Sequence, residues 1–180
     1  WVGMLAVGTI LPSEWIIEHL PTSMPSATEQ LLQSIMKEPT GYLAVGILGP
    51  VAEEMVFRGA VLRTLLNLFS QKSHWWAILI SAVLFGAIHF NTAQFAHALP
   101  IGLLLGWMYY RTGSILPGLL FHWVNNTVAY LMFNLMPQLG DGKLIDLFHG
   151  SSHSLGMGLF FSVCIILPCL FQLNMRMKKG

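Results

Sequence analysis

The stretch from Gly49 to Gly59 reads GPVAEEMVFRG and places two adjacent glutamates and an arginine inside an apolar run of the chain. That run covers about residues 41–70 and is otherwise composed like a membrane-spanning helix. A charge at the centre of such a helix costs at least about 2.5 to 3.5 kcal/mol, so ionisable residues there usually face a bundle interior or a water-filled cavity. The stretch therefore predicts a helical membrane protein with a polar site inside it.

The composition of the whole chain favours the same class. Of its 180 residues, 54% are hydrophobic and only 9% are charged, whereas soluble domains carry about 25% charged residues. The net charge is +1 and the basic residues are mostly scattered singly, so we expect the lipid bilayer as a partner and no nucleic acid. The chain begins with Trp1 instead of methionine, and we expect an upstream segment to be processed or missing.

Hydropathy and turn residues predict an all-α, polytopic transmembrane bundle that forms a single membrane-embedded domain over residues 1–180. About six spanning helices are expected, at about 1–20, 41–70, 75–91, 95–110, 114–136 and 155–175. The second is too long for one straight crossing at about 1.5 Å per residue, and Pro50 is expected to bend it. An amphipathic helix around EQLLQSIM, residues 29–36, is expected at the membrane surface.

Lysine and arginine residues are distributed unequally between the two ends of the expected spans. One end collects five of them: Lys72, Arg111, Arg176, Lys178 and Lys179. The other end has two: Lys37 and Lys143. Because cytoplasmic loops carry an excess of basic residues, the C-terminus is predicted to be cytoplasmic.

Three pairs of residues with a spacing of four lie on three different expected helices. They are Glu54 and Arg58 in EEMVFR, Phe85 and His89 in FGAIH, and His122 and Asn126 in HWVNN. Residues four apart share one face of a helix, so three helices can direct a carboxylate, two imidazoles and an amide into one cavity. Glu53 lies about 100° further round its helix and has no local partner.

Each pair also has a purely structural interpretation. Glu54 and Arg58 can form an ion pair that only joins helices, and a single intramembrane histidine such as His89 is often an interhelical hydrogen bond. His122 and Asn126 can likewise be a polar contact between helices. The coincidence of three polar faces in one small bundle favours chemistry. No catalytic role is expected for the other histidines, which are His19, His74, His97, His149 and His153.

The motifs EEMVFR, FGAIH and HWVNN, in this order on successive apolar segments, resemble those of the CAAX prenyl protease and bacteriocin-processing family of intramembrane proteases, also called the CPBP or Abi family. The likeness covers about residues 41–130 and includes the connecting YYRTGSILPGLLFH. Each motif alone is a weak signal, but the combination is specific. The resemblance implies an endopeptidase in the inner or plasma membrane of a prokaryote, acting on membrane-associated or lipid-anchored proteins or peptides.

The resemblance also implies a role for each matched residue. The expected catalytic group is Glu53, Glu54, His89, His122 and Asn126, supported by Arg58 and Phe85. Within it, Glu53 is the expected general base that activates a water molecule, with help from His89. His122 and Asn126 are expected to stabilise the oxyanion of the tetrahedral intermediate.

Other mechanisms and functions stay open at this point. Glu53, His89 and His122 would also suit a zinc ion with a fourth position for water, although the chain has no His-Glu-x-x-His motif. A metal-free mechanism without a cofactor is favoured. The alternative functions are a proton-coupled transporter that uses the buried Glu and His residues, and a non-catalytic membrane scaffold or immunity partner. No pattern in the sequence indicates an oligomeric state.

Overall fold

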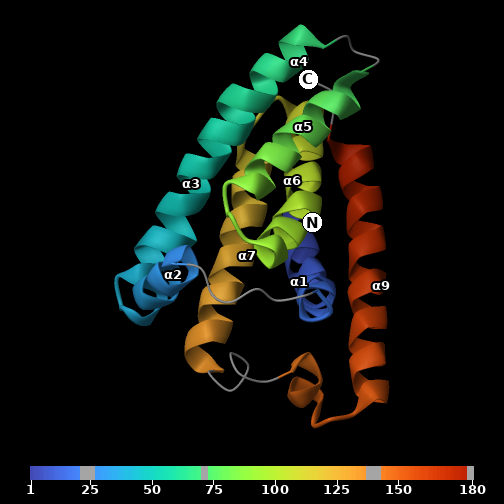
Figure 1. Ribbon diagram of the computed structural model, residues 1–180. Coiled ribbons are helices and arrows are strands. Elements are labelled where there is room, and N and C mark those ends of the chain that lie inside the picture. Colours follow the sequence, from blue (N-terminus) through green and yellow to red (C-terminus); the bar gives the residue numbers. More distant parts are fainter. Residues whose placement is uncertain (21–26, 70–72, 137–142, 178–180) are drawn as a thin grey trace.

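The computed structural model describes residues 1–20, 27–69, 73–136 and 143–177 (Figure 1). These residues form helices, turns and connections without any strand, which confirms the prediction of an all-α fold. The helices, in chain order, are α1 (Val2–Glu18), α2 (Ala27–Lys37), η1 (Leu43–Leu48), α3 (Gly49–Glu54), η2 (Met55–Leu62), α4 (Arg63–Leu68), α5 (His74–Ala87), α6 (Thr92–Thr112), α7 (Leu116–Leu135), η4 (Leu144–Phe148) and α9 (Ser152–Arg176).

Each of the six expected apolar segments contains at least one of these helices. Five of the segments correspond to α1, α5, α6, α7 and α9, and the longest one holds η1, α3, η2 and α4. Among the described residues, α9 is the one helix long and apolar enough to cross a membrane by length and hydropathy, and α5 is apolar but shorter. The expected segments are therefore helical, and the number of membrane crossings stays a prediction.

The segment that carries the three charges is one continuous helix from Leu43 to Leu68, in which η1 and η2 have the wider turn of a π-helix. The residues at its internal junctions all keep helical backbone angles. Pro50 has no amide hydrogen to offer. In the turn before it, the amide of Gly49 bonds to the carbonyl oxygen of Ala44, five residues back. The helix therefore accommodates Pro50 by widening its turns, without a break.

Four helix pairs define the bundle: α5 packs along α6, α1 packs against both α7 and α9, and α3 packs against α7 (Figure 1). The main core lies where α1, α6, α7 and α9 meet, and Leu5, Leu105 and Phe121 are fully buried there. A smaller cluster of Phe57, Phe85 and Ala98 lies beside the charged segment. Arg58, the charged residue of η2, lies against this cluster, with its guanidinium 4.5 Å from the centre of the Phe85 ring.

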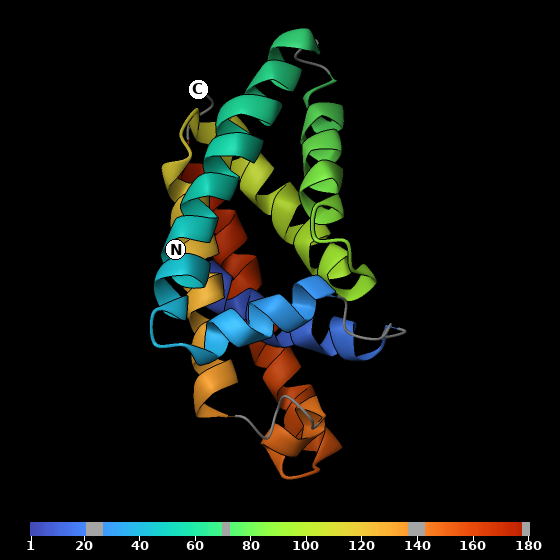
Figure 2. The same cartoon turned by 60° about the vertical axis from the view of Figure 1, so that its left-hand side comes forward.

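Helix α2 runs across the long helices instead of alongside them (Figure 2). It corresponds to the predicted amphipathic segment, which is confirmed to be helical. Its C-terminal end is attached to α7, because the Asn134 amide donates to the carbonyl oxygen of Met36 at 3.2 Å and the Tyr130 hydroxyl donates to that of Glu38 at 3.3 Å. These bonds hold α2 against one end of the bundle.

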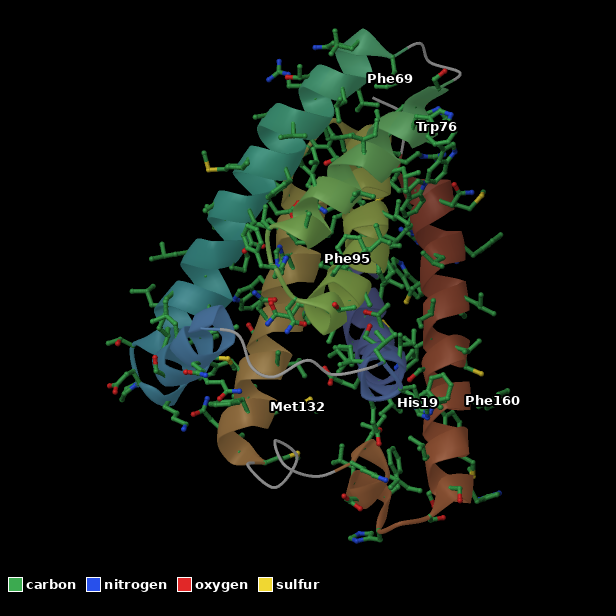
Figure 3. The ribbon with its side chains drawn as sticks, in the orientation of Figure 1. His19, Phe69, Trp76, Phe95, Met132 and Phe160 are labelled. Carbon is green, nitrogen blue, oxygen red and sulfur yellow. The ribbon has the colours of Figure 1, made fainter. Side chains whose placement is uncertain are left out.

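The outward face of α9 is strongly apolar. Phe160, which projects from α9 in Figure 3, is 64% exposed, and Phe171 and Met175 are also exposed. A continuous apolar surface of this kind fits contact with lipid.

At the far end of α9, Arg111 donates to the carbonyl oxygens of Asn174 and Met177, so the last turns of α6 and α9 lie together. This places Arg111 and Arg176 at the same end of the bundle. Three residues of the charge argument, Lys72, Lys178 and Lys179, lie outside the described residues. The orientation of the chain in a membrane therefore stays a prediction.

Candidate active site

The most deeply buried charges in the described structure are Glu54 and Arg58, whose side chains are 0% and 1% exposed. The structure contains the ion pair that their spacing predicts, with 2.8 Å between Arg58 Nη1 and Glu54 Oε1. Arg58 Nη2 also donates to the carbonyl oxygen of Gly102, and the guanidinium lies 4.5 Å from the centre of the Phe85 ring. Buried charges are tolerated only when they are paired and hydrogen-bonded, and these contacts give each of the two side chains a partner.

His122 from α7 lies between the two adjacent glutamates. Its Nδ1 is 3.3 Å from Glu54 Oε1, and its Nε2 is 3.5 Å from Glu53 Oε2. An ionised carboxylate can only accept hydrogen bonds. Each carboxylate can therefore accept a hydrogen from the ring nitrogen that faces it, and one imidazole contacts both glutamates.

A glycine allows α7 to come this close to Glu54. Gly118 lies one turn before His122, and a Cβ atom built on it would be 2.7 Å from Glu54 Oε2. A larger side chain there would overlap the Glu54 carboxylate, so either that side chain or α7 would have to move. Gly118, the second glycine of GSILPG (residues 113–118), therefore leaves room for the imidazole to approach the carboxylates.

His89 does not lie on a helical face as the spacing suggested, because α5 ends at Ala87 and His89 is in the turn that follows. Its Nδ1 is 3.0 Å from the carbonyl oxygen of Phe85. A carbonyl oxygen only accepts, so Nδ1 carries the hydrogen and Nε2 of the neutral ring has a free lone pair. The Phe85 ring is placed edge to face with both His89 and His122, at centroid distances of 5.5 and 5.8 Å.

Asn126 makes a contact that the sequence did not predict. Its Nδ2 donates to the carbonyl oxygen of Val45 at 3.0 Å, and Val45 belongs to the π-helical segment η1. A side-chain amide has two N–H donors, so one remains for another acceptor. Asn126 thus both joins α7 to η1 and presents an amide to the space beside it.

These side chains border one cavity with a volume of about 540 Å³. Four of the five expected catalytic residues line it: Glu53, His89, His122 and Asn126. Phe85 also lines it, whereas Glu54 does not. The Glu53 side chain is 29% exposed to solvent, whereas the Glu54 side chain is fully buried. Only Glu53 of the two adjacent carboxylates can therefore meet a water molecule. Apolar side chains, including Leu32, Ile35 and Met36 of α2, form much of the remaining wall.

Three polar residues of this cavity were missed by the sequence analysis: Gln94, His97 and Asn125. Asn125 stands within the HWVNN motif, three residues after His122, and helical spacing alone was a signal that it shares that face. His97 was expected to have no role because it falls near the end of an expected span. In the structure it lies in the second turn of α6 and faces the cavity.

The arrangement does not fit the alternative zinc site. Among the residues that the structure describes, no three His, Cys, Asp or Glu side chains are grouped so that they could hold one metal ion. Both nitrogens of His122 face carboxylates, so Glu53 and His122 are engaged with each other.

Comparison with known proteins identifies related chains. The sequence model of the family described as "Type II CAAX prenyl endopeptidase Rce1-like" matches residues 36–128, more than half of the chain. A protein of Bacillus subtilis (strain 168) named "Putative membrane peptidase YdiL" is 28% identical over 105 residues, which make up 58% of this chain and 42% of that relative. The chain thus spans less than half the length of this curated relative. No solved structure matches.

Proposed function

Because the chain belongs to the type II CAAX prenyl endopeptidase Rce1-like family, we propose that it is an intramembrane endopeptidase that hydrolyses a peptide bond with a water molecule activated by Glu53. The supporting observation is the position of Glu53. Its carboxylate is accessible from the cavity and lies 3.5 Å from Nε2 of His122, whereas Glu54 beside it is buried and paired with Arg58. One carboxylate is thus available for chemistry and its neighbour supports the structure.

In the first step, a water molecule in the cavity gives a proton to Glu53 as its oxygen attacks the carbonyl carbon of the scissile bond. His89 assists because Nε2 of its neutral ring is a hydrogen-bond acceptor and can orient the second hydrogen of the water. The carbonyl oxygen becomes an oxyanion as the tetrahedral intermediate forms. A cavity with mostly apolar walls strengthens each of these electrostatic contacts.

The contact between Glu53 and His122 links proton transfer from water to stabilisation of the oxyanion. While Glu53 is ionised, it attracts the N–H at Nε2 of His122. When Glu53 accepts the proton from water, that attraction weakens and the N–H becomes available to the oxyanion. Nδ1 of His122 stays oriented by Glu54, whose position is fixed in turn by Arg58. The free N–H of Asn126 is the second proposed oxyanion donor.

In the second step, the intermediate collapses and the bond between its carbon and the amide nitrogen breaks. The proton held by Glu53 moves to the leaving nitrogen, which departs as an amine, and the other product carries the new carboxyl group. Glu53 is then ionised again and attracts the N–H at Nε2 of His122 as before. Every proton in this sequence comes from the attacking water molecule, so the reaction consumes one water per bond and needs no cofactor.

The site lies inside a helical bundle, and we propose that this bundle crosses the membrane six times as a single domain, with its C-terminus in the cytoplasm. The natural substrate is then a protein or peptide that is embedded in the bilayer or anchored to it. The apolar wall that α2 contributes to the cavity supports a substrate segment with apolar side chains. A prokaryotic inner or plasma membrane is the proposed location.

The test compares the protein termini present in membranes from cells that express the wild-type protein or its Glu53→Gln variant at equal levels. New termini that occur only with the wild type are the expected result, and they would identify the substrate as well as the cleaved bond. Glu14→Gln serves as a matched control, because it alters a glutamate of α1 that does not line the cavity.

Two results would contradict the proposal. If the termini are the same in all three strains while the protein still has a biological effect, the effect does not require hydrolysis and the scaffold function is favoured. If the protein instead carries a pH-driven flux across vesicle membranes, and the flux is insensitive to substitution of Asn126, the transporter function is favoured.

A further inference from the structure

Helix α6 contributes a stripe of residues to the cavity that none of the three motifs includes. Gln94, His97, Ala98 and Ile101 all line it, and their spacing places them on one face of the helix. Ala98 and Ile101 are nearly inaccessible, whereas Gln94 and His97 are only partly buried. The stripe therefore leads from the inside of the bundle outward, with its two polar side chains at the more open end.

The polar side chains of this stripe have no hydrogen-bond partner in the described part of the chain. Nδ1 of His97 is buried without one, and the Gln94 side chain forms none. On the facing helix α7, Asn125 is 7% exposed and lines the same cavity. Buried polar groups normally have partners, so the unpartnered Nδ1 of His97, together with two further polar side chains on the same cavity, indicates a ligand with complementary polar atoms.

A peptide substrate in lipid needs such partners. A bond can be cleaved only after the segment around it leaves its helix, and the N–H and C=O groups of that segment then lose their internal hydrogen bonds. An apolar environment offers these groups no replacement partners, so leaving them unsatisfied is strongly unfavourable. Glu53, His89, His122 and Asn126 are used at the scissile bond itself. The neighbouring peptide groups require other donors and acceptors.

We propose that Gln94, His97 and Asn125 bind the substrate backbone on both sides of its extended segment. Gln94 and His97 do so from α6, and Asn125 does so from α7. The ligand is a peptide in extended conformation with apolar side chains, which fit the walls formed by α2 and by Ile101. These three residues are binding and positioning residues, not catalytic ones. The inference rests on the proposed function of the same cavity.

If His97 only stabilised the fold, its replacement by leucine would lower the melting temperature. The structure leads to a different expectation. Because Nδ1 of His97 is buried and unpartnered, His97→Leu removes an unsatisfied polar atom and adds apolar contact. The melting temperature of this variant is expected to stay the same or to rise. Its affinity for a peptide is expected to fall by about three- to tenfold, the contribution of one neutral hydrogen bond.

The experiment measures binding without cleavage. The purified chain carrying Glu53→Gln is placed in lipid nanodiscs, and its Kd is measured by fluorescence anisotropy for a fluorescein-labelled peptide of leucine and alanine residues flanked by lysines. The same background then receives His97→Leu, Gln94→Leu or Asn125→Leu. His97→Gln tests rescue, because it restores a hydrogen-bonding side chain. His153→Leu is the matched control, since His153 is exposed on α9 and does not line the cavity.

A second series of peptides replaces one backbone amide at a time by an ester, which removes an N–H donor and weakens the carbonyl acceptor. At one position, the ester is expected to weaken binding to the parent protein but to have no further effect on the His97→Leu protein. That non-additivity identifies a hydrogen bond between His97 and the peptide backbone. A structural defect would instead weaken the binding of all the peptides equally.

The results separate this inference from the proposed function. If the His97, Gln94 and Asn125 variants bind the peptide as well as the His153 control does, the backbone-binding role is wrong even where Glu53-dependent cleavage occurs. If these variants lose affinity while the wild type cleaves no protein in membranes, the cavity is a peptide-binding site and the hydrolytic function is wrong.

Discussion

Gly118 on α7 lies directly against the carboxylate of Glu54 on α3, so close that a Cβ atom there would be 2.7 Å from Oε2. The absence of a side chain at Gly118 leaves room for the Glu54 carboxylate between α3 and α7. We therefore expect the proposed activity to depend on a residue with no chemistry of its own.

Gly118→Ala is expected to displace α7 and to weaken the contacts of His122 with both glutamates. Overpacking of this kind destabilises proteins by about 1 to 3 kcal/mol, and the displaced site should lose at least about tenfold in kcat. Gly156→Ala on α9 is the control, because a Cβ atom there meets nothing within 4 Å. Cleavage rate and melting temperature are measured for both variants. Equal activity of the two would show that the contact between Gly118 and Glu54 is unimportant.

The adjacent glutamates are expected to respond differently to the same substitution. Glu53→Gln should abolish hydrolysis with little change in melting temperature, because Glu53 is partly exposed. Glu54→Gln leaves Arg58 buried without its counter-charge, which typically costs about 3 to 5 kcal/mol.

Thermal unfolding in detergent, together with a cleavage assay, separates the two effects. The double variant Glu54→Gln with Arg58→Met should recover part of the lost stability, because no buried charge is left unpaired. If Glu54→Gln alone is as stable as the wild type, the buried pair does not have the structural role assigned to it.

Asn126 has one observed contact and one proposed role, and a control variant is needed to separate them. Asn126→Asp keeps the size of the side chain but removes both N–H donors, so the bond to the Val45 carbonyl and the proposed oxyanion contact are lost together. Loss of one oxyanion donor lowers kcat by about 10²- to 10³-fold. Val45→Pro is unsuitable as a control, because it would disturb η1 itself.

Tyr42→Phe is the better control for Asn126. It removes the hydroxyl that contacts Thr127 and Trp123 on α7, and so loosens the same pair of helices without touching an oxyanion donor. A similar loss of kcat in both variants would assign Asn126 to helix packing alone.

Metal removal is expected to leave the activity unchanged. The described His, Cys, Asp and Glu residues are not grouped as ligands of one ion, and the proposed steps use only the protons of water. Cleavage by the purified protein is measured before and after treatment with EDTA and phenanthroline. The outcome that would reject this prediction is stoichiometric zinc in the purified protein that disappears in His89→Ala.

Much of the fold could be predicted from the sequence, because apolar segments and their polar interruptions are local properties. The segments expected at 95–110 and 114–136 correspond to α6 and α7, and the amphipathic pattern around 29–36 corresponds to α2. The π-helical turns of η1 and η2 were not predictable in this way. Such turns are rare, and they depend on the packing of the neighbouring helices.

The site was less predictable than the fold. The spacing of Glu54 and Arg58 was sufficient to predict their ion pair, since both lie on one helix. The positions of His89 and Asn126 depend on where α5 ends and on how closely η1 approaches α7. His97 gave no signal in the sequence, because a single histidine near the start of a helix is common and only the assembled bundle shows what it faces.

The widened turns of η2 have a consequence for comparing related sequences. A π-helical turn holds about one residue more than an α-helical one, so it absorbs an extra residue within one wider turn. In this helix, Leu62 is fully buried and lies close to Gly106 of α6. Deleting one residue just after Arg58 would convert a widened turn into an α-helical one and keep Leu62 directed at α6. An alignment that matches the motif and opens a one-residue gap behind it therefore pairs helices that are in phase.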